Sequence, residues 1–355
     1  MTIRINTDFP GGNVVVRGIR EKTVLLRQDV WRTSLDWFYW YFEAESEEDA
    51  VYTFQFYSRV ISSGGVAMTP DRGRSWKFIP SETWDRFSWE MKKGVPVRFC
   101  LGQQYLQEDL DIFLEKNPAI RRDFLCWSPR GREVELLRIG EESPEKIPIL
   151  FTARHHACEM HANHVLEGIF TEILQTPNFL AKYVVFAVPF VDKDGVEEGE
   201  QGKGRVPHDH NRDYIEESIY PETISLKKLG EEKQFQVVMD FHCPGLAAEK
   251  IFIFGSEHPR IEQNIERFGE LLGEVGPRWL NFTVDSNIHK FGIGYNKTYP
   301  DGIPCSRYFA GRPCARMAFS NEISYDFASG VLLTQERLRE YGAGIARALL
   351  NMELR

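Results

Sequence analysis

The chain lacks several features that would place it in a broad protein class. No stretch approaches about 18 consecutive apolar residues, so the sequence predicts no membrane-spanning helix. Basic residues are not in excess: the formal net charge is −9, which argues against sequence-independent nucleic-acid binding. The six cysteines form no CxxC pair, and we expect reduced thiols.

The first residues, MTIRINTDFPGGNVVV, also lack an apolar core and a small-residue cleavage site. This predicts no signal peptide and, with the reduced cysteines, a cytoplasmic protein. A chain of 355 residues is expected to form one large domain or two unequal ones. Nothing in the sequence indicates the oligomeric state.

Residues 1–104 are expected to form a small all-β sandwich domain. They contain short β-branched or aromatic runs separated by polar or glycine-containing turns, a pattern typical of sandwiches. The runs are 14–16, 23–26, 37–42 and 52–57. No histidine occurs before His155, so few catalytic residue types lie here.

Residues 105–355 are expected to form a separate α/β domain. Strand-like and helix-like segments alternate, which is typical of a parallel or mixed sheet flanked by helices. The expected strands are 133–139, 147–152, 183–191, 235–241 and 251–254, and the expected helices include 165–174, 259–272 and 335–352. A charged, glycine-rich loop is expected at 192–207, and long loops in compact domains are often functional.

The sharpest chemical signal is RHHACE at 154–159, directly after the expected strand 147–152. His156 and Glu159 are spaced i, i+3, so their side chains point the same way at a helix start or in a tight turn. Imidazole and carboxylate suit a borderline cation such as Zn²⁺. HxxE also arises by chance, but open α/β sheets place their sites at the carboxyl ends of strands.

A third ligand is expected from another strand end. The run VVMDFHCP at 237–244 carries an apolar strand into Asp240 and His242. Taken alone, His242 is better explained as a core histidine. Beside HxxE we interpret His242 as a ligand and Asp240 as the group that fixes a ligand tautomer. Two histidines and one glutamate leave a coordination position for water, as in catalytic zinc sites.

Further groups suit hydrolysis, although each alone would be an ordinary surface residue. Glu322 ends an apolar stretch and is interpreted as the general base. Asn211 and Arg212 are adjacent, and a guanidinium suits a bidentate contact with a substrate carboxylate. Arg205 is interpreted as a group that stabilises a developing oxyanion.

Together these segments resemble the zinc carboxypeptidases of the M14 type. The family order is HxxE, an Asn-Arg pair, a His after a strand and a Glu before the C-terminal helix. Residues 189–196 are similar to the family's NPDG segment. Runs such as 37–39 and 67–70 resemble the cytosolic carboxypeptidase branch, which carries an N-terminal β-sandwich. The resemblance covers nearly the whole chain.

The resemblance implies a mixed sheet of eight strands flanked by helices, preceded by the β-sandwich. It implies a zinc metallocarboxypeptidase with one Zn²⁺ per chain and a peptide or protein C-terminus as substrate. Nucleic acid and membrane are not expected partners. The implied roles are zinc binding by His156, Glu159 and His242, carbonyl polarisation by Arg205, carboxylate binding by Asn211 and Arg212, and water activation by Glu322.

The sequence also departs from the family pattern. Ala157-Cys158 stand inside HxxE where Pro-Gly is usual, and Cys243 follows the last ligand. We interpret Cys158 and Cys243 as small apolar filler. The family's mobile tyrosine corresponds to Tyr299 or Tyr308.

Substrate preference rests on Arg307, upstream of Glu322. An arginine in the pocket would match an acidic C-terminal residue by charge, but Arg307 fits an outward-packing loop residue equally well. Two other functions stay open. One is a related zinc amidohydrolase acting on a small acylated amino acid or a cell-wall peptide. The other is a binding module whose catalytic site has decayed.

Overall fold

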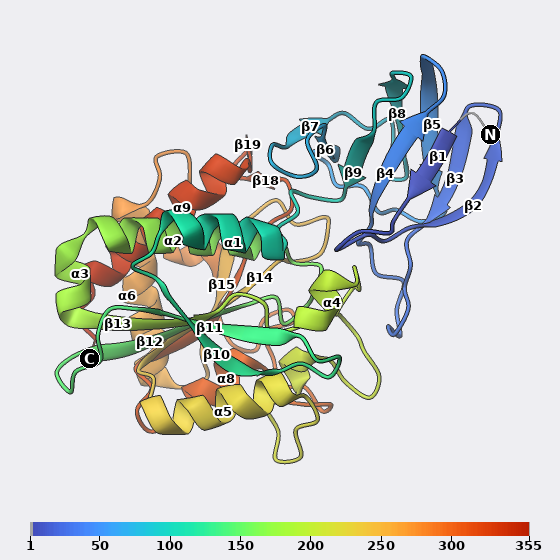
Figure 1. The fold of residues 1–355 in the computed structure, drawn as a ribbon. Helices are drawn as coiled ribbons and strands as arrows, with labels where there is room; N and C mark the ends of the chain where they lie inside the picture. The colour runs from blue at the N-terminus through green and yellow to red at the C-terminus, as the bar shows by residue number, and fades with distance from the viewer. Residues whose placement is uncertain (1–2, 355) are drawn as a thin grey trace.

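The computed structural model describes residues 3–354 as an all-β region followed by an α/β region (Figure 1). The all-β region has one sheet in the order β1-β4-β9-β6-β7 and another in the order β2-β3-β5-β8. Its strands are β1 (Ile3–Asn6), β2 (Val15–Arg20), β3 (Thr23–Arg27), β4 (Tyr41–Ser46), β5 (Ala50–Phe56), β6 (Val66–Thr69), β7 (Lys77–Ile79), β8 (Arg86–Met91) and β9 (Val97–Cys100).

Aromatic side chains join these two sheets. Phe54 of β5 meets Phe42 of β4 and Phe99 of β9, with ring centroids 5.4 and 5.3 Å apart. Phe87 of β8 meets Phe99 at 5.1 Å. All four rings are fully buried. The inward-facing positions of both sheets therefore supply one core, and the predicted sandwich is confirmed.

One expected strand is shorter than predicted. The run 37–42 is predicted to be a β-strand throughout, but strand β4 begins only at Tyr41. The backbone N–H and C=O of Tyr39 instead bond to the side-chain amide of Gln201, at 2.8 Å each. Residues 38–40 are buried because they pack on both regions, not because they belong to a sheet.

The α/β region is built on an eight-stranded mixed sheet, as predicted, in the order β10-β11-β13-β12-β14-β17-β15-β16. Its strands are β10 (Arg121–Trp127), β11 (Glu133–Ile139), β12 (Ile147–Ala153), β13 (Tyr183–Val188), β14 (Val237–His242), β15 (Phe252–Phe254), β16 (Ile288–His289) and β17 (Met317–Glu322). A separate hairpin pairs β18 (Phe327–Ala328) with β19 (Val331–Leu332).

Helices cover both faces of this sheet (Figure 1). On one face α2 packs along α9, and α6 packs against α9 and β17; on the other, α5 lies on β10 and α8 on β14 and β17. The helices are α1 (Gln107–Lys116), α2 (His161–Gln175), α3 (Pro177–Lys182), α4 (Lys193–Glu197), α5 (Pro221–Lys233), α6 (Pro259–Val275), α7 (Val284–Asn287), α8 (Cys305–Ala310) and α9 (Gln335–Leu350), with a 3₁₀ turn η1 at His210–Arg212.

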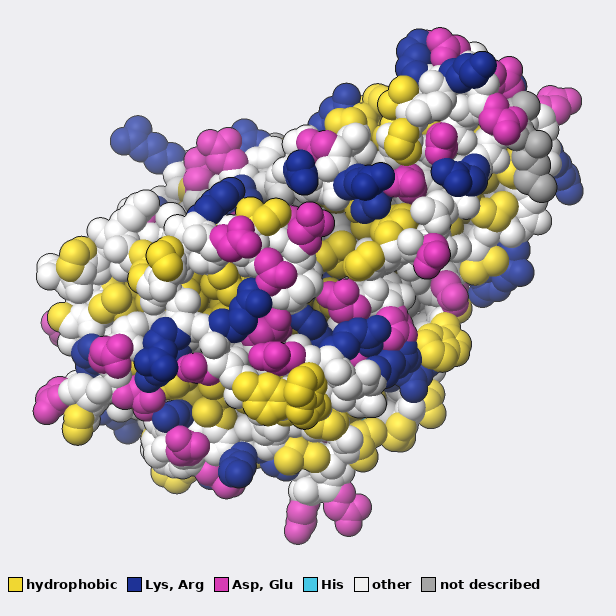
Figure 2. All heavy atoms as spheres, in the orientation of Figure 1, with side chains coloured by type: hydrophobic (Ala, Val, Ile, Leu, Met, Phe, Trp, Pro, Cys, Tyr) yellow, Lys and Arg dark blue, Asp and Glu magenta, His cyan; other side chains and the backbone are white. Residues whose placement is uncertain are grey.

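Two surface findings bear on the sequence predictions. Within residues 3–354, no helix is both long and apolar enough to cross a membrane. Figure 2 shows acidic and basic side chains interspersed over one face of the molecule.

The last sandwich strand ends at Cys100 and α1 begins at Gln107. The domain boundary after residue 104 stays a prediction.

Candidate metal centre and active site

The candidate site lies where three neighbouring parallel strands end. Strands β12, β14 and β17 lie side by side, with His242 at the end of β14 directly beside Glu322 at the end of β17. The HxxE segment follows the end of β12. Because the carboxyl ends of parallel strands meet at one sheet edge, segments far apart in the sequence converge here.

Three side chains converge as a potential ligand set. Nδ1 of His156 lies 2.9 Å from Oε1 of Glu159, and Nδ1 of His242 lies 2.7 Å from Oε2 of the same carboxylate. The potential ligand atoms of His156, Glu159 and His242 all lie within 4.8 Å of one another. The two imidazoles therefore present the same nitrogen to a shared centre.

The opposite ring nitrogens face carboxylates. Nε2 of His242 lies 2.6 Å from Asp240, and Nε2 of His156 lies 3.6 Å from Asp209. A carboxylate at Nε2 favours the tautomer protonated there, which leaves the Nδ1 lone pair for a metal. Asp240 also accepts bonds from Nδ1 of His155 (2.7 Å) and from the Thr152 hydroxyl (2.8 Å).

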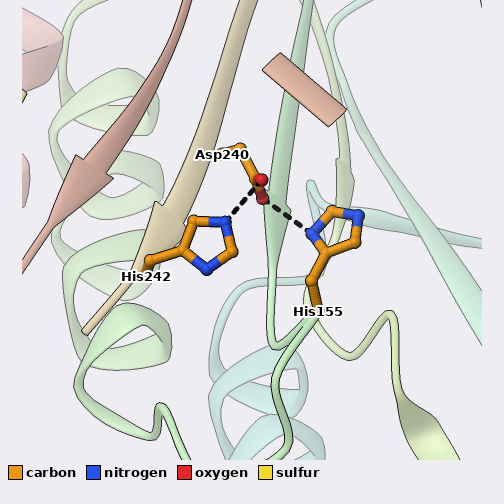
Figure 3. A group of neighbouring side chains, drawn as sticks. All are labelled: His155, Asp240 and His242. Carbon is orange, nitrogen blue, oxygen red and sulfur yellow. Dashed lines mark hydrogen bonds and ion pairs between the residues drawn. The ribbon is translucent and has the colours of Figure 1, made fainter. Parts of the chain in front are cut away.

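His155, Asp240 and His242 form a second cluster of potential ligands (Figure 3). Asp240 lies between the two imidazoles and bonds to both, and the remaining nitrogen of His155 bonds to the Tyr214 hydroxyl at 2.7 Å. His155 and Asp240 are fully buried and do not line the cavity described below. This cluster therefore has no free coordination position and supports the first one.

The donor set of the first cluster fits zinc. Two neutral imidazoles and one carboxylate are ordinary zinc ligands, and their second nitrogens have the carboxylate partners common around bound zinc. Burial disfavours a charged Glu159, yet the imidazoles of His156 and His242, which are protonated when no metal is bound, and the ammonium of Lys203 lower the pKa of its carboxyl well below the usual range. Glu159 is therefore ionised, as a metal ligand requires.

A cavity of about 420 Å³ opens onto this centre and is lined by His156, Glu159, His242 and Glu322. The side chain of Glu322 is buried, and its Oε2 has no hydrogen-bond partner among the described residues. Burial raises the pKa of Glu322 to about 7. A carboxylate poised near neutrality beside the ligand set can take and return a proton.

Asn211 and Arg212 also line the cavity. The turn η1 presents them, because the Asp209 side chain accepts the N–H of Asn211 and so caps it. The guanidinium of Arg212 stacks on the Tyr299 ring with 3.9 Å to its centroid. Asn211 Oδ1 accepts the N–H of Cys305 at 2.9 Å, which fixes its amide.

The structure does not bring Arg205 to this cavity. Its guanidinium is 2.5 Å from Asp192 and 2.7 Å from Glu200, and these buried carboxylates hold it outside the cavity lining. Lys203, two residues earlier, lines the cavity instead, with Nζ 2.7 Å from Oε1 of Glu159. Sequence spacing in a glycine-rich loop did not distinguish these two cations.

The remaining predicted residues divide between the cavity and its surroundings. Tyr299 and Arg307 line the cavity, as does Tyr295, which the sequence did not single out. Tyr308 packs instead on Tyr214 and Phe309 outside the cavity.

The two cysteines beside the ligands differ slightly in position. Cys158 is buried with its sulfur 3.7 Å from the Tyr325 hydroxyl, and Cys243 lies at the cavity wall. Burial raises the pKa of both thiols, so they remain protonated.

Comparison with known proteins gives matches at the level of structure. No protein-family model and no curated protein matches the sequence. A metallo-carboxypeptidase from Pseudomonas aeruginosa superposes with a TM-score of 0.80 at 20% identity, covering 98% of each chain. A metallo-carboxypeptidase from Burkholderia cenocepacia gives 0.83 at 17% identity, again over 98% of each chain.

A carboxypeptidase A from Helicoverpa armigera matches less of the chain: 70% of this one and 72% of that one, with a TM-score of 0.53 and 12% identity. The two bacterial likenesses extend over nearly the full length, including the sandwich. The chain therefore has the fold of the metallo-carboxypeptidases, with the N-terminal β-sandwich included in the likeness.

Proposed function

We propose that this chain is a zinc metallocarboxypeptidase that releases the C-terminal residue of a peptide. The observation that carries the proposal is one cavity in which His156, Glu159 and His242 present ligand atoms beside the unpartnered carboxylate oxygen of Glu322. A zinc ion held by these three residues would polarise a water molecule and the scissile carbonyl.

The other groups account for position and proton transfer. Arg212, fixed against Tyr299, offers its guanidinium to the terminal carboxylate of the peptide, and Asn211 lies next to it. Glu322 takes a proton from the attacking water and passes it to the leaving amine. Asp240 accepts a hydrogen bond from Nε2 of His242, and Asp209 lies 3.6 Å from Nε2 of His156, so the two carboxylates hold the two histidines in position.

An acidic C-terminal residue is the proposed preference. Arg307 lines the cavity with its guanidinium 4.7 Å from the Phe291 ring centroid and 3.4 Å from Glu257. The Phe291 ring and the Glu257 carboxylate fix the direction of the Arg307 guanidinium. An acidic side chain of the substrate would compete with Glu257 for this guanidinium. Replacing Arg307 by Ala should reduce the preference for Glu over Leu substrates. Arg312→Ala, two residues after the end of α8 and outside the cavity lining, is the matched control.

The test of the activity combines metal analysis with peptide hydrolysis. Purified protein, Glu159→Ala and His242→Ala are analysed for zinc and assayed on peptides with free and amidated C-termini. We expect about one zinc per chain in the wild type, its loss in both variants, and hydrolysis only of free C-termini. Cleavage of acylated amino acids but not peptides would favour the amidohydrolase. A folded protein that takes up no zinc would favour the binding module.

A further inference from the structure

The residue with the most unusual position in the cavity is Lys203. Its Nζ lies 2.7 Å from Oε1 of Glu159 and 3.0 Å from the carbonyl oxygen of Cys243. An ammonium group has three N–H donors, and these are its two hydrogen-bond partners among residues 3–354, so one donor faces the cavity.

The sandwich domain supplies the surroundings of this ammonium. The rings of Trp37 and Phe38 lie 5.4 and 5.7 Å from Nζ, and Trp37 also lines the cavity. Aromatic walls on one side and Glu159 on the other leave the side chain only 10% exposed. A residue of the N-terminal region therefore forms part of the cavity wall.

Loop 199–205, which carries Lys203, is tightly held between the two regions. Gly199 has φ +68° and Gly202 has φ +75°. A Cβ at Gly199 would collide with carbonyl oxygens of Gly11 and Gly12 in the sandwich region, and one at Gly202 with the backbone of His156 and Ala157. Both positions therefore require glycine for conformation and for space.

Hydrogen bonds from the sandwich region hold this loop at successive residues. Asn13 Nδ2 donates to the carbonyl of Gly199 at 2.6 Å, and the Gln201 amide bonds to both backbone groups of Tyr39. On the other side, the N–H of Cys158 donates to the carbonyl of Gln201 at 3.2 Å. The same short loop is thus fixed to the sandwich and to the HxxE segment.

Thr33 and Ser34 of the sandwich region bond to the loop backbone at Lys203 and at the next residue. The Thr33 hydroxyl donates to the carbonyl of Lys203 itself at 2.7 Å. Ser34 donates twice to the carbonyl of Gly204, from its backbone N–H at 2.8 Å and its hydroxyl at 2.9 Å. These bonds fix the backbone from which the Lys203 side chain enters the cavity.

We propose that Lys203 is a catalytic cation of this enzyme and that the segment 33–39 of the sandwich domain positions it. This inference rests on the proposed function. The attacking water oxygen bonds to the carbonyl carbon while Glu322 takes its proton, and the C=O electron pair moves onto the carbonyl oxygen. The ammonium of Lys203 stabilises that negative charge. The C–N bond then breaks, and Glu322 gives the proton to the amine nitrogen.

The experiment compares Lys203→Met and Lys203→Arg in the zinc-loaded protein. We expect Lys203→Met to lower kcat by about 10²- to 10³-fold, the usual loss for one oxyanion donor, with unchanged zinc content. Lys203→Arg keeps the charge and should recover much of that loss. A phosphinic pseudo-dipeptide, whose tetrahedral anion imitates the charged oxygen, should bind Lys203→Met about 100-fold more weakly by calorimetry.

The positioning role is tested by the double variant Thr33→Val/Ser34→Ala. It removes two hydroxyl bonds to the loop and should lower kcat about 10-fold with KM and zinc content unchanged. The matched control is Ser63→Ala, which removes a hydroxyl that joins the two regions elsewhere, 2.8 Å from Asp326. The control should keep the wild-type kcat.

Two results would overturn the inference. Wild-type kcat and phosphinate affinity in Lys203→Met would remove the catalytic role, and an equal loss in Ser63→Ala and the double variant would remove the positioning role. If the wild type hydrolyses no peptide, the proposed function fails. In that case, weaker phosphinate binding by Lys203→Met than by the wild type would still show that this ammonium binds an anion in the cavity.

Discussion

Replacing Asp240 by Asn tests the buried support of the metal centre. The carboxylate is fully buried and accepts three bonds, from His242, His155 and Thr152, at 2.6, 2.7 and 2.8 Å. An amide of the same size has one acceptor oxygen and a donor NH₂ group in place of the second oxygen. At most one of the two histidines can then keep its acceptor (Figure 3).

The magnitude follows from which histidine loses its partner. An NH₂ group facing Nε2 of His242 favours the tautomer with the proton on Nδ1, where the metal is expected to bind. Removing such a supporting partner typically weakens metal binding about 10- to 100-fold, which corresponds to about 1.4–2.7 kcal/mol. One buried donor without an acceptor costs about 1–3 kcal/mol of folding stability.

The assay is zinc competition against a fluorescent chelator, with unfolding followed in parallel. The control is Asp326→Asn, which alters another fully buried aspartate that accepts bonds from Ser63 and Gly64 but does not contact the ligands. We expect both variants to lose stability and only Asp240→Asn to lose zinc affinity. Equal zinc affinity in Asp240→Asn and the wild type would refute the argument from the tautomer.

Three further predictions concern the site and the core. Glu322→Gln should lower kcat by about 10²- to 10⁴-fold without changing zinc content, since its amide cannot accept the proton of water; peptide hydrolysis near wild-type rate would contradict its role. Burial raises the pKa of Glu322 to about 7, and only the ionised carboxylate acts as a base, so kcat/KM should rise with pH. A bound cation favours the ionised carboxylate, so the midpoint of the rise in kcat/KM should lie at or below pH 7. A pH profile in which kcat/KM does not fall at acidic pH would count against Glu322 as the base. Phe54→Ala should destabilise the sandwich by about 3–5 kcal/mol in denaturant unfolding, because its buried ring contacts those of Phe42 and Phe99.

Much of the fold was predictable because local patterns agree with the tertiary structure. The alternating run at Glu133–Ile139 is strand β11, and the apolar run that begins at Ile147 is β12. The stripe from Val165 to Leu174 lies within α2, which packs along α9. Buried faces with the period of a helix or a strand leave a clear trace in sequence.

Three features of the structure left no clear trace in the sequence pattern. The run 37–42 has strand composition, but Tyr39 bonds to Gln201, a residue far along the chain. The expected loop 192–207 starts with the helix α4, capped by the Asp192 side chain. Arg205 and Lys203 have similar sequence surroundings, and only the partners Asp192 and Glu200 decide that the arginine turns away.

The sequence by itself determined the residue types of the site and the class of fold. HxxE after an apolar strand, a histidine at the end of another strand and a glutamate at the end of a third are visible without coordinates, because strand ends and ligand spacing are local properties. The tertiary structure alone decided which residues meet. Strand register puts His242 beside Glu322, and packing of the sandwich on loop 199–205 puts Lys203 in the cavity, since such contacts join segments whose separation in sequence carries no local signal.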